Sequence, residues 1–221
     1  MRSAKGKATD KSPSGLRNRR RDSSPGDGRR RYYDRRYEAM AVKLLPGDHY
    51  CTQDPNEMIV TVLGSCVAAC IRDPKTGFGG MNHFMLPASD NYEWGGISAA
   101  MRFGNHAMET LINEIIRTGC PRERLEIKVF GGGNVIKSKR MVGHDNARFV
   151  ETYLQNEGLA IDAKDLGGYR PRRIHYFPHS GSVKRLLLER TQDLEVFEAE
   201  QSPIIAPEPE SEAGSIDLFT D

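Results

Sequence analysis

The feature that most restricts the fold of this chain is the separation of charge along it. Residues 1–36 carry 13 basic and 4 acidic side chains, residues 37–188 carry 18 and 16, and residues 189–221 carry 1 and 10. The formal net charge of +2 therefore averages a basic segment, a balanced segment and an acidic one. The balanced segment has the length of one ordinary domain with a sizeable core, so we expect a single folded domain over residues 37–188.

Both ends have compositions typical of disordered segments. Residues 1–36 consist mainly of Arg, Lys, Ser, Gly and Asp, so ordering them would cost backbone entropy with little apolar burial in return. Residues 189–221 are rich in Glu and Pro. The arginine triplets at 19–21 and 29–31 fit either an arm for phosphates or a solvated extension. The extension is favoured and no nucleic-acid partner is expected, because no nucleic-acid-binding fold follows; an arm that binds nucleic acid would show strongly salt-dependent affinity.

Several protein classes are excluded by what the sequence lacks. No apolar run reaches the roughly 20 residues of a membrane-spanning helix, and the basic N-terminus lacks the apolar core of a secretory signal, so we expect a cytoplasmic protein without membrane insertion. The four cysteines form no CxxC pair, which argues against a zinc site or a disulfide scaffold. Reduced thiols, no metal and no cofactor are expected.

The middle segment alternates between strand-like and helix-like patterns, which predicts an α/β or α+β domain with a mixed sheet. The expected helices cover residues 98–118 and 145–157. The expected strands cover residues 58–63, 66–72, 78–86, 125–130, 159–163, 173–177 and 183–188.

Two of these strands are expected to form a hairpin that brings a cysteine and a histidine together. If residues 73–76 are the loop, Arg72 pairs with Gly77, and counting outward places Cys66 opposite His83. Opposed residues project to one face with Cβ atoms about 5 Å apart. A thiol beside an imidazole is the arrangement of a cysteine nucleophile, because the imidazole activates the thiol and later protonates the leaving group.

The same pattern has less specific interpretations. A buried cysteine is often a small core residue, a strand histidine is often structural, and a slip of one residue would turn the two side chains to opposite faces. Gly64 and Ser65 favour the catalytic interpretation, because glycine permits a backbone shape that exposes the thiol of Cys66 and small neighbours leave room for substrate.

Other candidates are weaker. Cys70 is expected in the core, and His175 and His179 are expected to have structural roles, although both could line a pocket. The glycine run at 131–133 lacks the spacing of a phosphate-binding loop. We interpret this run as a tight turn beside the site or as a close contact with a helix.

Four motifs resemble the chemoreceptor glutamine deamidases of the CheD family. The first two together are specific, the others are weak alone, and all follow in order through the middle segment. They are TVLGSCVA at 61–68, GGMNHFMLP at 79–87, KVFGGG at 128–133, and DLGG at 165–168 followed by RIHYFP at 173–178.

The resemblance implies a fold, an activity and a set of site residues. The implied fold is an α/β sandwich shared with some deamidating bacterial toxins, and the implied activity is hydrolysis of glutamine side-chain amides on methyl-accepting chemotaxis receptors. Cys66 corresponds to the nucleophile, His83 to the general acid and base, and Thr61 to the residue that orients the imidazole. A thioester intermediate would form, and no metal or cofactor is implied. We expect the backbone N–H groups around Ser65 and Cys66 to be the oxyanion donors.

Two points stay open at this stage. Thr61 precedes Cys66 by an odd number of residues, so within one regular strand their side chains would point apart. Thr61 can join the site only if Gly64 and Ser65 break the strand. The resemblance also implies, for some members, a regulatory binding module that partners a CheC-type phosphatase, and this is the alternative function.

Overall fold

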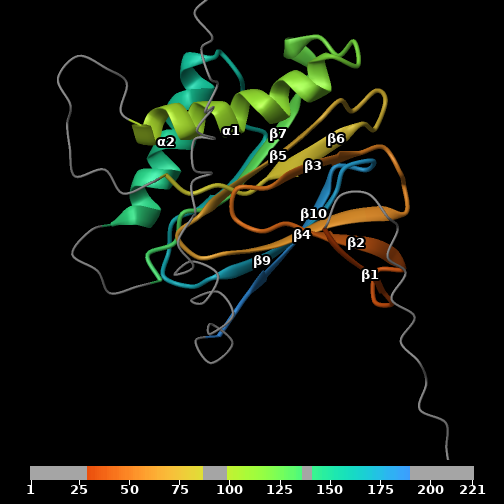
Figure 1. Ribbon diagram of the computed structural model, residues 1–221, viewed down its shortest axis with the longest axis horizontal. Helices are drawn as coiled ribbons and strands as arrows, with labels where there is room; N and C mark the ends of the chain where they lie inside the picture. The colour runs from red at the N-terminus through yellow and green to blue at the C-terminus, as the bar shows by residue number, and fades with distance from the viewer. Residues whose placement is uncertain (1–28, 87–98, 136–140, 190–221) are drawn as a thin grey trace, which may run out of the picture.

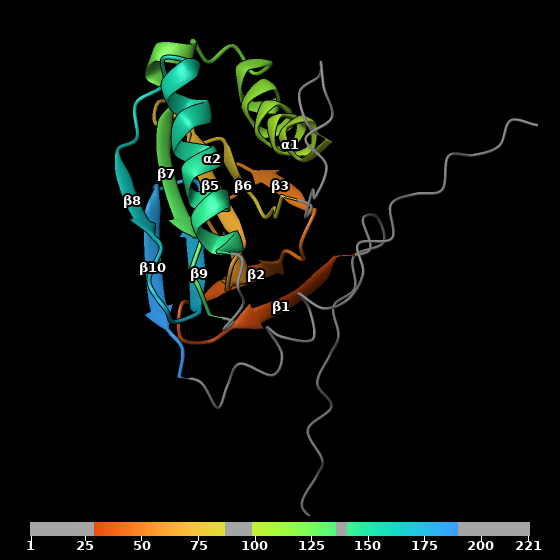
Figure 2. The same cartoon turned by 90° about the vertical axis from the view of Figure 1, so that its left-hand side faces the viewer.

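The chain folds into three layers, two of sheet and one of helix (Figures 1 and 2). The structure is a computed structural model that describes residues 29–86, 99–135 and 141–189. The central sheet has the order β3-β6-β5-β7-β8, and the outer sheet has the order β1-β2-β4-β9-β10. Figure 2 shows the two helices against one face of the central sheet and the outer sheet on its other side.

The bounds of the elements are as follows. The central sheet consists of β3 (His49–Thr52), β5 (Val67–Arg72), β6 (Gly79–Asn82), β7 (Glu126–Gly131) and β8 (Ala163–Leu166). The outer sheet consists of β1 (Arg30–Asp34), β2 (Ala39–Lys43), β4 (Glu57–Leu63), β9 (Arg172–Phe177) and β10 (Ser182–Leu187). The helices are α1 (Ala99–Ile116), α2 (Val142–Asn156) and the short 3₁₀ helix η1 (Arg122–Arg124).

Both sheets are mixed, which confirms the expected α+β sandwich. β2 pairs with β4, and β7 with β8, in parallel, whereas the remaining strand pairs are antiparallel. Within the described ranges, no helix is long and apolar enough to cross a membrane.

The alternation of β5 explains why the central sheet is covered on both faces. Successive side chains of a strand point to opposite sides. Val67, Ala69 and Ile71 pack into the cluster beneath the helices, whereas Ala68 and Cys70 pack into the cluster between the two sheets. A strand buried on both faces reads as a continuous apolar run, as residues 67–71 do.

Both helices lie close to their predicted ranges, whereas one predicted strand is absent. α1 matches its expected range, and α2 begins three residues early and ends before Gly158, which has a φ of +66°. The strand expected at 159–163 is wrong, because Leu159 and Ile161 fill the cluster beneath the helices from a loop. Asp162 then bonds the backbone of Ile127 in both directions and leads the chain into β8.

Strand β1 lies inside the segment expected to be disordered. The composition did not predict this strand, because sheet pairing and charged contacts stabilise it with little apolar burial. β1 pairs with β2 over its full length. Arg31 forms a 2.6 Å ion pair with Glu57 and lies over the Tyr50 ring. Residues 1–28 and 190–221, which make up most of the two segments expected to be disordered, lie outside the described residues. Strands β2 and β3 were also missed by the sequence patterns.

The predicted hairpin exists, but its register differs by two residues. Arg72 pairs with Gly79 instead of Gly77, because Asp73 closes the hairpin by bonding Phe78 and the loop is residues 74–77. The register therefore places His83 opposite Ala68, and not opposite Cys66. Because the difference is even, Cys66 and His83 still belong to the same face of the central sheet.

Candidate functional site

A buried threonine and histidine meet between the two sheets. Thr61 projects from the inner face of β4, and His83 follows the last residue of β6 in the central sheet. Their Oγ1 and Nδ1 atoms lie 2.8 Å apart, and the two residues are 0% and 3% exposed. The structure thus brings together two of the three residues that the resemblance assigned to the site.

The condition on Thr61 is met by a break in the chain between two strands. β4 ends at Leu63 in the outer sheet and β5 begins at Val67 in the central sheet. The intervening residues 64–66 cross from one layer to the other, so the odd spacing between Thr61 and Cys66 no longer turns their side chains apart. The crossing is what allows both residues to face the space between the sheets.

A tight turn holds the backbone of His83 on both sides. Gly47 donates its N–H to the His83 carbonyl at 2.7 Å, and His83 donates its N–H to the Asp48 carbonyl at 2.9 Å. Asp48 closes this turn by donating to the Leu45 carbonyl and accepting the Leu45 N–H through its carboxylate. Pro46 and Gly47 occupy its central positions, and Gly47 has a φ of +92°, as a type II turn requires.

The hydrogen bonds at Nδ1 define which ring nitrogen of His83 carries the proton. The Thr61 hydroxyl donates to the Leu44 carbonyl at 3.1 Å, so its only proton is used and its oxygen accepts from Nδ1–H. The other nitrogen, Nε2, is buried and has no hydrogen-bond partner among the described residues. Burial lowers the pKa of His83 to about 4, against a smaller opposing effect of the Leu44 carbonyl. His83 is therefore neutral at pH 7, with Nε2 as the basic atom.

Cys66 lies at the layer crossing, on the face of the central sheet that carries His83. It is fully buried in the cluster between the sheets together with Ala68. Because Ala68 is opposite His83, Cys66 is the diagonal neighbour of the histidine, a relation that places Cβ atoms within about 7–8 Å. Continuing the register outward places Met85 opposite Cys66, and the Met85 sulfur lies 3.7 Å from Ser65 Oγ.

Three donors bind the three carbonyl groups of the crossing at residues 64–66. Gly133 donates its N–H to Gly64 at 2.8 Å, and Gly132 donates to Cys66 at 2.7 Å. The third donor is the Asn146 side chain, which reaches the Ser65 carbonyl at 2.9 Å from α2. All three peptide planes around the cysteine are consequently fixed.

The glycine run satisfies both sequence interpretations at once. The run turns the chain beside the site, and Gly132 has a φ of +63° there. The run also contacts a helix, because a Cβ added at Gly132 would lie 2.7 Å from the Cβ of Ala147 in α2. A larger residue at this position would separate α2 from the loop that holds the cysteine turn.

Asn146 is the residue that sequence reasoning missed. It is 0% exposed, and its side chain joins the two halves of the site: Nδ2 donates to Ser65 before the cysteine, and Oδ1 accepts from the Leu86 N–H beyond the histidine. The only sequence signal was a polar residue in the apolar stripe of the expected helix. The turn that holds His83 was signalled by the dipeptide Pro46-Gly47, a strong turn pattern.

The weaker candidates have other positions. Cys70 is a core residue between the sheets, and burial raises the pKa of its thiol. His175 lines a pocket on the far face of the outer sheet, whereas His179 lies in the exposed turn after β9. Among the described residues, no group of three His, Cys, Asp or Glu side chains could bind a metal ion.

The fold and site together describe an α+β sandwich with a buried hydroxyl–imidazole pair beside a cysteine. A profile of the family described as CheD chemotactic sensory transduction matches residues 85–185, a range that begins just after His83. The chain is 55% identical to a protein of Rhodopseudomonas palustris over 87% of this chain and 91% of that protein, and 46% identical to one of Halorhodospira halophila over 90% and 94%. Both relatives carry the name "Probable chemoreceptor glutamine deamidase CheD". The chain belongs to the CheD family.

Among solved structures, the hypothetical protein YfiH of Bacillus licheniformis aligns with a TM-score of 0.30 at 17% identity. The alignment covers 46% of this chain and 33% of the other. This likeness is too low to support an argument about fold or function.

Proposed function

We propose that this protein hydrolyses glutamine side-chain amides on chemotaxis receptors through a thioester on Cys66. The observation that carries the proposal is the buried pair of Thr61 and His83, which leaves a basic Nε2 on the face of the sheet shared with the cysteine. The names of the relatives give the substrate, because both are chemoreceptor glutamine deamidases by name.

The first half of the reaction forms the thioester. The Cys66 sulfur attacks the carbonyl carbon of the glutamine side chain while its proton passes to His83 Nε2. The carbonyl oxygen becomes an oxyanion, and the imidazolium then protonates the amide nitrogen, which leaves as ammonia. Thr61 keeps the imidazole in the required tautomer throughout, because its oxygen accepts from Nδ1–H.

The second half opens the thioester with water. His83 Nε2 takes a proton from the attacking water, the carbon–sulfur bond breaks, and the proton returns to the departing sulfur. The products are a glutamate side chain, ammonia and the free enzyme. A neutral imidazole at the start of each half is what this sequence needs, and burial lowers the pKa of His83 accordingly.

The resting site is closed to substrate. Cys66 is 0% exposed and His83 only 3%, so a receptor side chain reaches them only when a covering residue moves. Met85 is the natural cover, because it is half-buried opposite Cys66 and its unbranched thioether adapts easily to new neighbours. Binding of the receptor would displace this side chain.

The test is deamidation of receptor peptides followed by mass spectrometry, with wild type, Cys66→Ala and Cys70→Ala. Cys70 is the matched control, because it is buried in the same cluster on the same face of the sheet. We expect conversion of amide to acid with wild type and Cys70→Ala and none with Cys66→Ala. Conversion by Cys66→Ala would show that Cys66 is not the nucleophile.

The alternative function, binding of a CheC-type phosphatase, is distinguished by the same variant. A binding module keeps its partner when Cys66 is replaced by alanine, whereas an enzyme loses its product. If neither wild type nor variant converts receptor glutamine and both bind the phosphatase, the binding function replaces the enzymatic one.

A further inference from the structure

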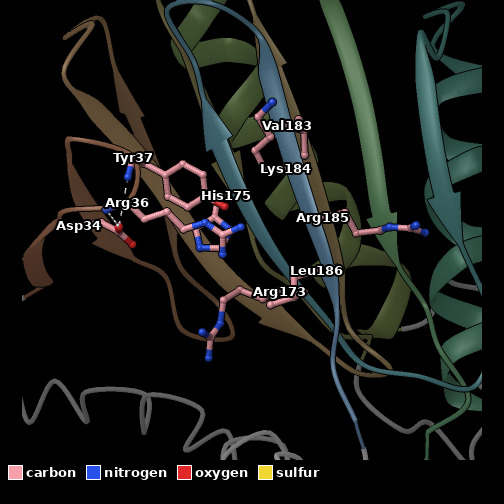
Figure 3. A pocket seen from close by; sticks show the side chains of 9 residues that line it. All are labelled: Asp34, Arg36, Tyr37, Arg173, His175, Val183, Lys184, Arg185 and Leu186. Carbon is pink, nitrogen blue, oxygen red and sulfur yellow. Dashed lines mark hydrogen bonds between the residues drawn. The ribbon is translucent and has the colours of Figure 1, made fainter.

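A second polar site lies on the face of the outer sheet that points away from Thr61 and His83. It is a cavity of about 400 Å³ whose walls come from the end of β1 and its turn, from β9 and from β10 (Figure 3). Its lining consists of Asp34, Arg36, Tyr37, Arg173, His175, Val183, Lys184, Arg185 and Leu186.

The alternation of β9 separates this pocket from the candidate active site. Ile174 and Tyr176 point into the cluster between the sheets, so Arg173 and His175 point outward. Lys184 of β10 pairs with His175 and therefore shares its face. Thr61 of β4 pairs with Ile174 on the inner face, so the two sites lie on opposite faces of the outer sheet.

Cationic side chains dominate the pocket. The side chains of Arg173 and Lys184 form no hydrogen bond or ion pair with any residue that the structure describes. The guanidinium of Arg185 is the exception: it binds Asp165 at 3.0 Å, and Figure 3 shows its side chain extending away from His175. The only acid of the lining, Asp34, accepts the backbone N–H groups of Arg36 and Tyr37.

His175 is the most deeply buried titratable residue of this lining. The residue is only 7% exposed, its ring lies 4.9 Å from that of Tyr37, and Nδ1 is buried without a hydrogen-bond partner in the described part of the chain. Burial lowers the pKa of His175, and the charge of Arg173 lowers it further. A buried polar atom left unpaired is unfavourable, and a bound group that pairs with it would remove this penalty.

We propose that this pocket binds a small phosphate-class dianion, either the free ion or a phosphate monoester. Arg36, Arg173 and Lys184 supply positive charge around the ligand, and His175 donates from Nδ1 after taking up one proton. With Asp34 counted, the three cations carry a net charge of +2, and the proton taken up by His175 raises it to +3, so a dianion is more favourable here than a monoanion. A tetrahedral anion offers more acceptor oxygens than a carboxylate does, which suits donors that arrive from three elements.

The test measures phosphate binding to the full chain by the NMR signals of the His175 ring. We expect a saturable shift with inorganic phosphate and a rise in the pKa of His175 on binding, since a ligand that prefers the charged ring must stabilise it. Acetate at equal ionic strength is expected to bind at least about tenfold more weakly. Phenyl phosphate is the second probe: tighter binding than phosphate assigns the site to monoesters, and weaker binding assigns it to the free ion.

Variants with a matched control separate a built site from general attraction to a basic surface. Arg173→Gln and Lys184→Gln should each weaken phosphate binding about tenfold. Arg185→Gln removes the same charge from the next residue of β10, but Arg185 pairs with the inward-facing Ile174 and its guanidinium binds Asp165, so phosphate affinity should stay close to wild type. Absence of saturable binding, equal binding of acetate, or an equal loss in Arg185→Gln would overturn the proposal.

Discussion

Two histidines on opposite sides of the outer sheet differ in what surrounds them, although their burial is similar. His83 is 3% exposed and His175 is 7% exposed, each has one buried ring nitrogen without a partner among the described residues, and burial lowers the pKa of both. His83 is held through its backbone and through Nδ1 by neutral groups. His175 instead shares its pocket with cationic side chains.

Under the two proposals, this difference separates a histidine for acid–base chemistry from a histidine that binds a ligand. A catalytic imidazole must keep one tautomer and one orientation, which hydrogen bonds to Thr61 and to the Gly47 turn provide. An imidazole that binds an anion needs positive charge around it and gains its proton with the ligand. Burial and a lowered pKa alone therefore do not identify the catalytic histidine.

The largest expected effect comes from His83→Asn. Asparagine can still donate toward Thr61 but lacks the basic Nε2, so receptor deamidation should fall about 10³-fold. His106→Asn, on the exposed face of α1, is the control and should keep full activity. The phosphate response of His175 should survive in His83→Asn. Normal deamidation by this variant would remove His83 from the reaction.

The sequence predicted one side of this comparison and not the other. The hairpin predicted Cys66 opposite His83, whereas His83 lies opposite Ala68; only the shared face of the two residues was predicted correctly, because an even change of register preserves the face of each side chain. The pocket around His175 depends on β1 and its turn, which composition assigned to a disordered arm. A strand stabilised by Arg31 and Glu57 gives no apolar pattern to detect.

Several elements in which apolar periodicity and burial coincide were predicted close to their observed ranges. They are α1, β4, β7 and β9. The loop at 159–161 was predicted as a strand because Leu159 and Ile161 are apolar. Both residues pack against the core from a loop and are not part of a strand. Contacts between distant segments, such as the one from Asn146 to Ser65, have no local signature and could not be predicted.

Thr61→Val should give the second largest effect. Valine has the shape of threonine but cannot accept the Nδ1 proton, so His83 loses the partner that fixes its tautomer. Activity should fall about tenfold or more, since a lost hydrogen bond to the general base shifts its orientation as well as its proton. Nitrogen NMR of His83 should show a smaller fraction of the Nδ1–H tautomer. Thr61→Ser keeps the hydroxyl and should restore both; if it does not, packing explains the loss.

Asn146→Leu should lower kcat about tenfold with little change in KM, because the peptide carrying Ser65 is released while the substrate surface stays. Two buried backbone groups also lose their partners, at a cost of about 1–3 kcal/mol each. Ile115→Ala in the cluster beneath α1 is the control for stability, because it creates a buried cavity away from the site. A similar loss of kcat in Ile115→Ala would mean that stability and not positioning is responsible.

The smallest expected effect is the dependence of stability on pH, and it distinguishes the two histidines directly. The pKa of His83 is about 4 in the folded chain and about 6.5 when unfolded, so the unfolded state binds more protons between these values and stability falls as pH falls through this window. His175 acts in the same direction. His83→Asn should flatten this slope in urea denaturation from pH 7.5 to about 4.5.

Phosphate should remove only the part of the pH dependence that His175 contributes, because it stabilises the imidazolium of His175 in the folded chain. Asp73, whose carboxyl pKa is held down by Arg124, contributes only at lower pH. An unchanged slope in His83→Asn would contradict a neutral buried imidazole.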